Sequence, residues 1–291
     1  MKTALSETAV GAVLSQGARS LAAAGLPAAR LDAERLLGWA LGVDRLGLLI
    51  EPLRQVSPHA MERFREALER RRRQEPIQHI LECEEFGGLV LRTGPGALVP
   101  RPETELLVEW VLEREGREGP WRLAVDVGTG TGAIACALAV RVPHLRVLAV
   151  ERSPAALALA ADNIASLGLR ARVELLAGDL LEPVAGAAGT VDLVIANPPY
   201  IRSADLADLP QEVRDWEPGE ALDGGPDGMA VHRRLIAESP RVLRPGGWLL
   251  MEMGEGQAAD LSAAMEAAGF EAVGVQQDLR GIERMIAARK R

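Results

Sequence analysis

The chain has 291 residues and a mass of 31.1 kDa, which fits one large domain or two smaller ones. Hydrophobic residues make up 48% and charged residues 25% of the sequence, the balance of a globular protein with a substantial core. The 41 acidic and 33 basic side chains give a net charge of -8, which repels nucleic acid at long range.

Membrane and secreted classes find no support in the sequence. No run approaches the roughly 18 apolar residues of a membrane span, and the N-terminus lacks the apolar segment of a secretory signal. The two cysteines, Cys83 and Cys136, have neither zinc-site nor disulfide-framework spacing. We therefore expect a cytoplasmic protein that has no metal site and no membrane association.

Residues 1–75 have a helical pattern throughout, beginning at Thr3, and predict a small N-terminal helical domain. One helix should end before Gly25, a second should cover Ala28–Leu41, and Ser57-Pro58 should cap and open another. This part holds 12 Lys/Arg and 9 Asp/Glu, whereas residues 76–291 hold 21 and 32. The net charges of +3 and -11 separate two domains of different character.

Residues 76–105 have short alternating stretches with Gly and Pro, and predict a linker with a β-hairpin formed by Glu85–Leu91 and Ala97–Val99. Residues 106–291 alternate apolar strand patterns with helical ones, as a parallel α/β sheet with crossover helices does. The expected strands are Leu123–Val127, Val147–Val150, Val173–Leu176, Leu193–Ala196 and Trp248–Met251. The expected helices are Ala133–Val140, Pro154–Leu167, Met229–Leu243 and Ala258–Ala268.

The first of these strands runs into a glycine-rich loop. Its residues are Asp126, Val127, Gly128, Thr129, Gly130, Thr131 and Gly132. Glycines at the carboxyl end of a parallel strand let the backbone approach a ligand closely. The spacing is neither the G-x-G-x-x-G of dinucleotide sites nor a phosphate loop with Gly-Lys-Ser/Thr. A nucleotide-like cofactor of another kind is indicated.

The next two strands end in acidic residues. Glu151 can accept hydrogen bonds from both hydroxyls of a ribose, although it also suits the N-terminus of the helix that follows. Asp179 and Leu180 are placed to line an adenine pocket, and Asp179 could equally cap a turn. This glycine loop with its acidic partner resembles the S-adenosylmethionine site of Rossmann-like methyltransferases. The resemblance implies an added antiparallel strand pair, here Phe270–Val275 and Arg284–Ala287.

After the fourth strand comes Asn197-Pro198-Pro199-Tyr200. Two consecutive prolines have no N–H, so this loop offers carbonyl acceptors, to which Asn197 adds its side-chain oxygen. Tyr200 offers a flat face, so the natural guest is a planar group that carries an NH2. Holding both N–H bonds orients the nitrogen lone pair toward a methyl donor, and no strong general base is compulsory.

This motif resembles that of methyltransferases acting on exocyclic or amide nitrogen, and it fits adenine and glutamine acceptors alike. Other segments resemble the protein-(glutamine-N5) methyltransferases of peptide-chain release factors. They are Pro76–Leu81, Glu85-Phe86, Pro100–Leu106, Glu217-Pro218, Ala221-Leu222, Gly224-Gly225, Asp227-Gly228, Pro245–Gly247 and Met251–Gly254. The resemblance implies a Rossmann-like class I S-adenosylmethionine-dependent methyltransferase fold with a small N-terminal helical bundle and a linking β-hairpin.

The resemblance also implies site roles. The acceptor would be the glutamine of the Gly-Gly-Gln motif in class 1 release factors, bound by Asn197 to Tyr200. The cofactor S-adenosylmethionine would contact Asp126, Gly128–Gly132, Glu151, Asp179, Leu180 and Asn197. Arg101, Glu103 and Thr104 would bind the substrate, in a segment that closes over the cofactor. The N-terminal helical domain, residues 1–75, would serve substrate recognition. Glu82 stands where the family usually has Gly, and Leu180 where a larger ring is frequent.

Several points stay open at the level of sequence. Glu252 ends a strand that points toward the site, and it suits a direct contact and a supporting role equally. The long segment Ile201–Asp227 suits acceptor recognition. The alternative function is an N6-adenine methyltransferase of nucleic acid, which the net charge of -11 on residues 76–291 disfavours. We expect a monomer without stable DNA binding.

Overall fold

The computed structural model describes residues 7–291, so the expected helical start at Thr3 lies outside the described residues. The chain divides into two compact units. The helical unit comprises the described part of Met1–Glu82 together with Gln211–Trp216, and the sheet unit comprises Cys83–Pro210 and Glu217–Arg291. Residues 76–105, expected as a linker, are therefore shared between the two units.

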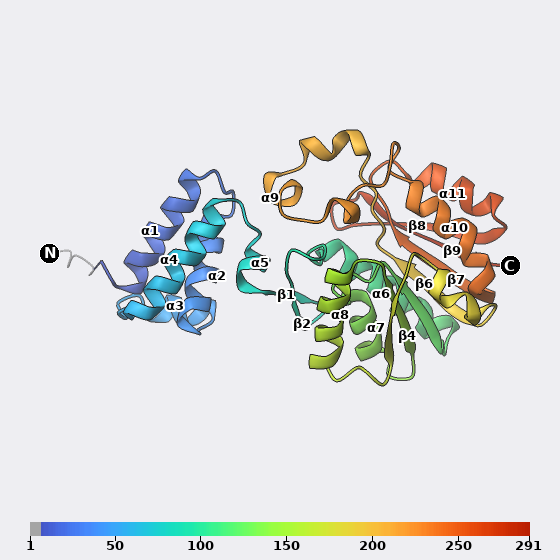
Figure 1. Cartoon of the computed structure of the whole chain (residues 1–291), viewed down its shortest axis with the longest axis horizontal. Coiled ribbons are helices and arrows are strands. Elements are labelled where there is room, and N and C mark those ends of the chain that lie inside the picture. The colour runs from blue at the N-terminus through green and yellow to red at the C-terminus, as the bar shows by residue number, and fades with distance from the viewer. Residues whose placement is uncertain (1–6) are drawn as a thin grey trace. The chain divides into compact units, whose positions relative to one another are not determined.

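The helical unit is built from amphipathic helices around its own apolar core (Figure 1). Its helices are α1 (Val10–Ala23), α2 (Ala29–Leu41), α3 (Arg45–Ile50), α4 (Pro58–Arg72), α5 (Ile77–Leu81) and α9 (Gln211–Arg214). The predicted cap of α4 is confirmed, because the Ser57 hydroxyl accepts a hydrogen bond from Ala60 N and Pro58 opens the helix. Leu14, Leu36 and Phe64 are fully enclosed in the core between the helices.

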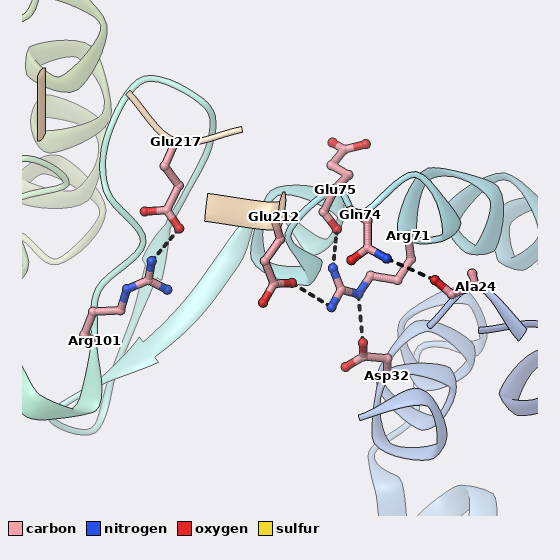
Figure 2. A network of polar contacts seen from close by, with 8 residues as sticks. All are labelled: Ala24, Asp32, Arg71, Gln74, Glu75, Arg101, Glu212 and Glu217. Carbon is pink, nitrogen blue, oxygen red and sulfur yellow. Dashed lines mark hydrogen bonds and ion pairs between the residues drawn. The ribbon is translucent and has the colours of Figure 1, made fainter. Parts of the chain in front are cut away.

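A buried arginine explains why Gln211–Trp216 belongs to the helical unit (Figure 2). The Arg71 guanidinium donates to Asp32 Oδ2 at 2.8 Å and to the Glu75 carbonyl at 2.8 Å. It also pairs with Glu212 Oε2 at 2.8 Å, although only 6% of the Arg71 side chain is exposed. A buried guanidinium needs such partners around its whole rim, and Glu212 supplies one from a distant part of the chain.

The sheet unit contains a seven-stranded sheet of order β5-β4-β3-β6-β7-β9-β8. Its strands are β3 (Leu123–Val127), β4 (Arg146–Glu151), β5 (Val173–Ala177), β6 (Val191–Ala196), β7 (Leu243–Glu252), β8 (Phe270–Gln277) and β9 (Glu283–Lys290). The first five strands are parallel, and β9 runs antiparallel to both β7 and β8. The five expected parallel strands and the expected final antiparallel pair are confirmed.

Helices cover both faces of this sheet (Figure 1). They are α6 (Pro102–Glu118), α7 (Ala133–Arg141), α8 (Pro154–Ser166), α10 (Ala230–Val242) and α11 (Ala258–Ala267), with short 3-10 turns η1 (Glu182–Ala187), η2 (Ser203–Asp208) and η3 (Gly219–Ala221). Side chains alternate along β3, so Ala124 joins the core beneath α6 and α7, and Val125 joins the core beneath α10 and α11. Both faces are buried, which explains the continuous apolar strand patterns.

Two details of the sequence prediction were wrong. The hairpin strands β1 (Cys83–Phe86) and β2 (Leu89–Arg92) pair with each other around a turn at Gly87-Gly88, in the middle of the stretch Glu85–Leu91 that was expected to form a single strand. Residues 97–99 form no strand. The helix α6 was not foreseen, because the motif at Arg101–Thr104 suggested a closing loop; Pro102 instead opens a helix at its first position.

Among residues 7–291, no helix combines the length and the apolar composition needed to cross a bilayer.

One buried side chain ties the hairpin to the glycine loop. Asn163 of α8 is fully buried, and its Oδ1 accepts from Arg92 N at 2.7 Å. Its Nδ2 donates to the carbonyls of Arg92 at 3.0 Å and Thr131 at 2.9 Å. A single side chain thus satisfies three backbone groups and holds β2 and the loop after β3 together.

We expect Asn163→Leu to lower the free energy of unfolding by about 2–4 kcal/mol, because it leaves three backbone polar groups without partners. Urea unfolding followed by tryptophan fluorescence measures this loss. The matched control is Asp162→Ala, which removes the exposed ion pair of the same Arg92 and should change the value by less than about 1 kcal/mol. Equal losses in the two variants would contradict the role given to Asn163.

Candidate active site

A cavity of about 430 Å³ lies within the sheet unit, where the order of the parallel strands reverses between β4-β3 and β6. The carboxyl ends of such strands are where open α/β sheets bind ligands, and a cavity of this size suits a small molecule. Most of the residues expected from the sequence line it, namely Arg101, Thr104, Gly128, Thr129, Gly130, Thr131, Glu151, Asp179, Leu180, Asn197, Pro198 and Pro199. Four others do not, namely Glu103, Asp126, Gly132 and Tyr200.

The glycine loop after β3 presents backbone to the cavity. Gly128 and Gly130 adopt φ values of +69° and +58°, a left-handed conformation that side chains disfavour. No side chain stands between the loop and the cavity at these positions. Gly132 also has positive φ, at +82°, but it opens α7 behind the cavity. Its role is therefore the turn into the helix.

Asp126 shapes the loop from beneath. Its side chain is fully buried, and Oδ2 accepts from the Thr129 hydroxyl at 2.5 Å and from Ala135 N at 3.1 Å. Oδ1 has no hydrogen-bond partner among residues 7–291. Burial, opposed by those two hydrogen bonds, raises the pKa of Asp126 to about 7. Asp126 thus positions the loop that lines the cavity.

Glu151, at the end of β4, is held by the backbone. Oε2 accepts from Gly130 N at 2.9 Å, and Oε1 accepts from Arg152 N at 2.8 Å and Ser153 N at 2.9 Å. The carboxylate is half-buried and lines the cavity. Glu151 thus accepts hydrogen bonds from the backbone just before α8 and also lines the cavity, which leaves the ribose interaction expected from the sequence a prediction.

The third strand brings Asp179 and Leu180 to the cavity wall. Asp179 pairs with Arg234 of α10 at 2.8 Å, and Leu180 adopts a left-handed φ of +48° that turns the chain along the wall. A half-buried leucine gives this wall an apolar surface. The pair of an apolar and an acidic side chain suits a heteroaromatic ring with exocyclic donors.

The acceptor motif lies at the end of β6. Asn197, Pro198 and Pro199 line the same cavity as the glycine loop, so the carbonyl acceptors and the backbone of that loop face one space. The Asn197 Nδ2 donates to the Thr104 hydroxyl at 3.0 Å. Tyr200 lies behind the lining, and its hydroxyl donates to Glu252 Oε1 at 3.3 Å. Burial beside Glu252 raises the pKa of the Tyr200 phenol, which stays protonated.

Glu252, at the end of β7, has a supporting position. Only 1% of the residue is exposed, and Oε2 accepts from the Thr104 hydroxyl at 2.7 Å. Burial raises the pKa of Glu252 to about 7, opposed by the hydrogen bonds from Thr104 and Tyr200. Glu252 does not line the cavity, so it contacts the site through Thr104 and Tyr200.

An ion pair between the half-buried Arg101 and the buried Glu217 ties the C-terminal part of segment 201–227 to the start of α6 (Figure 2). Arg101 Nη2 lies 2.5 Å from Glu217 Oε1, and only 1% of the Glu217 side chain is exposed. The residues that follow Glu217 line the cavity, namely Pro218, Glu220, Ala221 and Asp223. Glu103, beside Arg101, is half-buried in the first turn of α6. Arg101 therefore connects the start of α6 to the segment expected to bind the acceptor.

The sequence missed several apolar lining residues, namely Phe86, Ala97, Leu98, Pro100, Ile134, Val231 and Leu235. They come from the hairpin, the stretch before α6, α7 and α10. In the structure Gly96 packs closely against α8, since an added Cβ would lie 2.8 Å from the Ala155 side chain, and no pattern in the sequence pointed to this contact.

Two family descriptions match this chain. The PrmC N-terminal domain matches residues 12–81, and the methyltransferase small domain matches residues 102–211. The release factor glutamine methyltransferase of Geobacter sulfurreducens is 43% identical over 270 residues, 92% of each chain. That of Moorella thermoacetica is 44% identical over 281 residues, 96% of this chain and 97% of the relative.

The chain belongs to the release factor glutamine methyltransferase family. The resemblance on which the sequence analysis rested is thereby confirmed, and the chain is an enzyme of the methyltransferase class.

Solved structures confirm the predicted fold class. The catalytic domain of hMettl16 in complex with a 3′UTR hairpin has a TM-score of 0.59 at 19% identity, and covers 74% of this chain and 82% of that one. A T. thermophilus 16S rRNA methyltransferase in complex with AdoMet and guanosine has a TM-score of 0.52 at 23% identity, covering 72% and 50%. These chains share the Rossmann-like methyltransferase fold.

The raised pKa of Asp126 predicts a pH-dependent stability. The folded protein binds this proton more tightly than the unfolded chain does, so the stabilisation is complete below about pH 4 and lost as the pH rises through about 7. As the pH rises from about 4 to about 7, the free energy of unfolding of the unmodified protein should fall relative to that of Asp126→Asn. The fall should be at most roughly 1.4 kcal/mol per pH unit.

Urea unfolding at several pH values measures this difference. The control Asp162→Asn changes an exposed carboxylate and should keep the pH dependence of the unmodified protein. Parallel curves for the unmodified protein and Asp126→Asn would contradict the assignment.

Proposed function

We propose that this chain transfers a methyl group from S-adenosylmethionine to the side-chain amide nitrogen of the glutamine in the Gly-Gly-Gln motif of class 1 release factors. The observation that supports it most is that Asn197, Pro198 and Pro199 line the same cavity as the glycine loop. The relatives matched over 92% or more of both chains are named release factor glutamine methyltransferases, which supports a glutamine of a release factor as the acceptor.

The residues of the cavity fit S-adenosylmethionine. The left-handed glycines Gly128 and Gly130 leave room for the methionine part, and the Glu151 carboxylate suits the two ribose hydroxyls. Leu180 and Asp179 would hold the adenine. When bound, S-adenosylmethionine supplies an electrophilic methyl group on a sulfonium.

The acceptor loop would bind and orient the glutamine amide. The Asn197 Oδ1 and the Pro198 carbonyl accept its two N–H bonds, which turns the nitrogen lone pair toward the methyl group. As the nitrogen takes up the methyl group it would become acidic, and one of its two N–H protons would pass to solvent water. The hydrogen-bond acceptors around it stabilise the developing positive charge.

The helical unit would bind the release factor away from the reacting amide. Support comes from the segment 201–227, which contributes Gln211–Trp216 to the helical unit and Pro218 to Asp223 to the cavity wall. One continuous segment thus carries residues of the helical unit and residues of the cavity wall.

Mass spectrometry of a release factor incubated with this protein and S-adenosylmethionine tests the proposal. We expect one added methyl group, located by peptide fragmentation on the Gly-Gly-Gln glutamine. An unmodified release factor, together with tight cofactor binding in a titration, would overturn the acceptor assignment. Methylation of adenine in an oligonucleotide under the same conditions would establish the alternative function.

We expect Asn197→Ala to lower kcat/KM for the release factor by about 100- to 1,000-fold, because it removes an acceptor that is aimed at the reacting nitrogen. Steady-state kinetics with each substrate varied in turn measures the effect. Glu151→Ala is the matched comparison, because its loss should fall mainly on the KM for S-adenosylmethionine. Unchanged methylation by Asn197→Ala would contradict the site.

A further inference from the structure

Three side chains form a linear hydrogen-bonded series behind the acceptor loop. Asn197 Nδ2 donates to Thr104 Oγ1 at 3.0 Å, and Thr104 Oγ1 donates to Glu252 Oε2 at 2.7 Å. They come from three separate elements, the loop after β6, the first turn of α6 and the end of β7. Thr104 is 5% exposed and Glu252 is 1% exposed, so water does not readily substitute for either partner.

The direction of these hydrogen bonds follows from the chemistry of the last member. An ionised carboxylate only accepts hydrogen bonds, so Glu252 commits the single hydroxyl proton of Thr104 to itself. Thr104 Oγ1 can then only accept from its other neighbour. The Asn197 side chain must therefore turn its NH2 toward Thr104, which leaves Oδ1 as the end free to accept a hydrogen bond.

The reverse arrangement is available when Glu252 is protonated. The carboxyl could then donate to Thr104, and the Thr104 hydroxyl could donate to Asn197 Oδ1. The amide would be turned over, with its NH2 facing the acceptor nitrogen. Two donors would then oppose each other, and the acceptor amide would lose one of its partners.

We propose that the Glu252 carboxylate, acting through the Thr104 hydroxyl, holds the Asn197 amide in the orientation that accepts the N–H of the substrate amide. Thr104 and Glu252 are positioning residues in this arrangement, and Asn197 makes the contact. The inference rests on the proposed function, since it assigns the orientation of the group that binds the glutamine amide.

The surroundings of Glu252 set its charge. Thr104 and Tyr200 donate to the carboxylate, Arg284 of β9 favours the ionised form, and Glu103 of α6 opposes it. The ring of His232 in α10 contacts the Glu252 carbonyl at 2.8 Å, and burial lowers its pKa below the usual range. With burial the largest influence, the pKa of Glu252 lies at about 7.

The first test is a double-mutant cycle on kcat/KM for the release factor at saturating S-adenosylmethionine. We expect Thr104→Val, which keeps the shape and removes the hydroxyl, to lower kcat/KM by about 10- to 100-fold. Thr104→Ser should recover most of the loss. Combined with Asn197→Ala, Thr104→Val should cause no further loss, because it acts through the side chain already removed.

Thr93→Val is the matched control, since Thr93 is also buried in the sheet unit but does not line the cavity. It should keep the kinetics of the unmodified protein. Independent, multiplying losses from Thr104→Val and Asn197→Ala would overturn the proposal, as would full activity of Thr104→Val. A thermal melt of each variant confirms that it is folded.

A second readout does not depend on turnover. In the presence of S-adenosylhomocysteine, calorimetric titration with the release factor should show weaker binding by Thr104→Val and Asn197→Ala, by similar factors. Retained affinity in Thr104→Val beside lost affinity in Asn197→Ala would count against the positioning role.

The pH profile isolates Glu252. The kcat of the unmodified protein should fall as the pH decreases through about 7. A protonated Glu252 no longer requires the Thr104 hydroxyl as a donor, so that hydroxyl can donate to Asn197 instead. Glu252→Gln should be slower and should lack this acid limb between pH 6 and 8. Asp162→Asn, which changes an exposed carboxylate outside the site, should keep it. An acid limb that survives in Glu252→Gln would overturn the proposal.

These outcomes separate the two levels of inference. If the unmodified protein leaves the release factor unmethylated, the proposed function fails. If it methylates the release factor and Asn197→Ala does so with the expected lower kcat/KM, but the losses from Asn197→Ala and Thr104→Val multiply independently, only the positioning proposal fails.

Discussion

The parallel arrangement of β3, β4, β6 and β7 is the constraint on which the site depends. Because these strands run in one direction, all of them end at one edge of the sheet, whatever lies between them in the sequence. The glycine loop, Glu151, Asn197 and Glu252 each follow or end one of these strands. Residues separated by more than one hundred positions therefore meet around one cavity, and the intervening helices need only bury the two faces.

Polar groups behind the cavity hold the groups that line it. Asp126 holds Thr129, Asn163 holds the Thr131 carbonyl, and Glu252 holds Thr104. Each of these three is almost completely buried, so each hydrogen bond is made in a medium where an unpaired partner is costly. Buried polar side chains thus give the glycine and Asn-Pro-Pro loops a defined geometry that apolar packing alone would leave less specific.

Patterns that reflect local chemistry were readable from the sequence. The buried strands, the Ser57 cap and the glycine loop have signatures within a few residues, and the structure contains all three. The features that the sequence did not predict depend on residues that are distant in the chain. Whether Glu252 contacts the ligand was undecided because its neighbours Thr104 and Tyr200 are far away in the chain, and α6 was missed because its Arg101–Thr104 start also suits a closing loop. Glu82 shows a middle case: it adopts a left-handed φ of +58° at the end of α5, which explains why a glycine is usual in the family at this position.

Asp126 and Glu252 place stability and activity in opposition. Both carboxyls have a pKa of about 7 because they are buried, so the folded protein gains stability when they are protonated. The orientation of Asn197, in contrast, requires the ionised form of Glu252. A loss of activity on acidification would therefore occur while the fold becomes more stable with respect to these two groups. That opposite pH dependence is what distinguishes a positioning carboxylate from one that merely supports the fold, since for the latter activity and stability should change in the same direction.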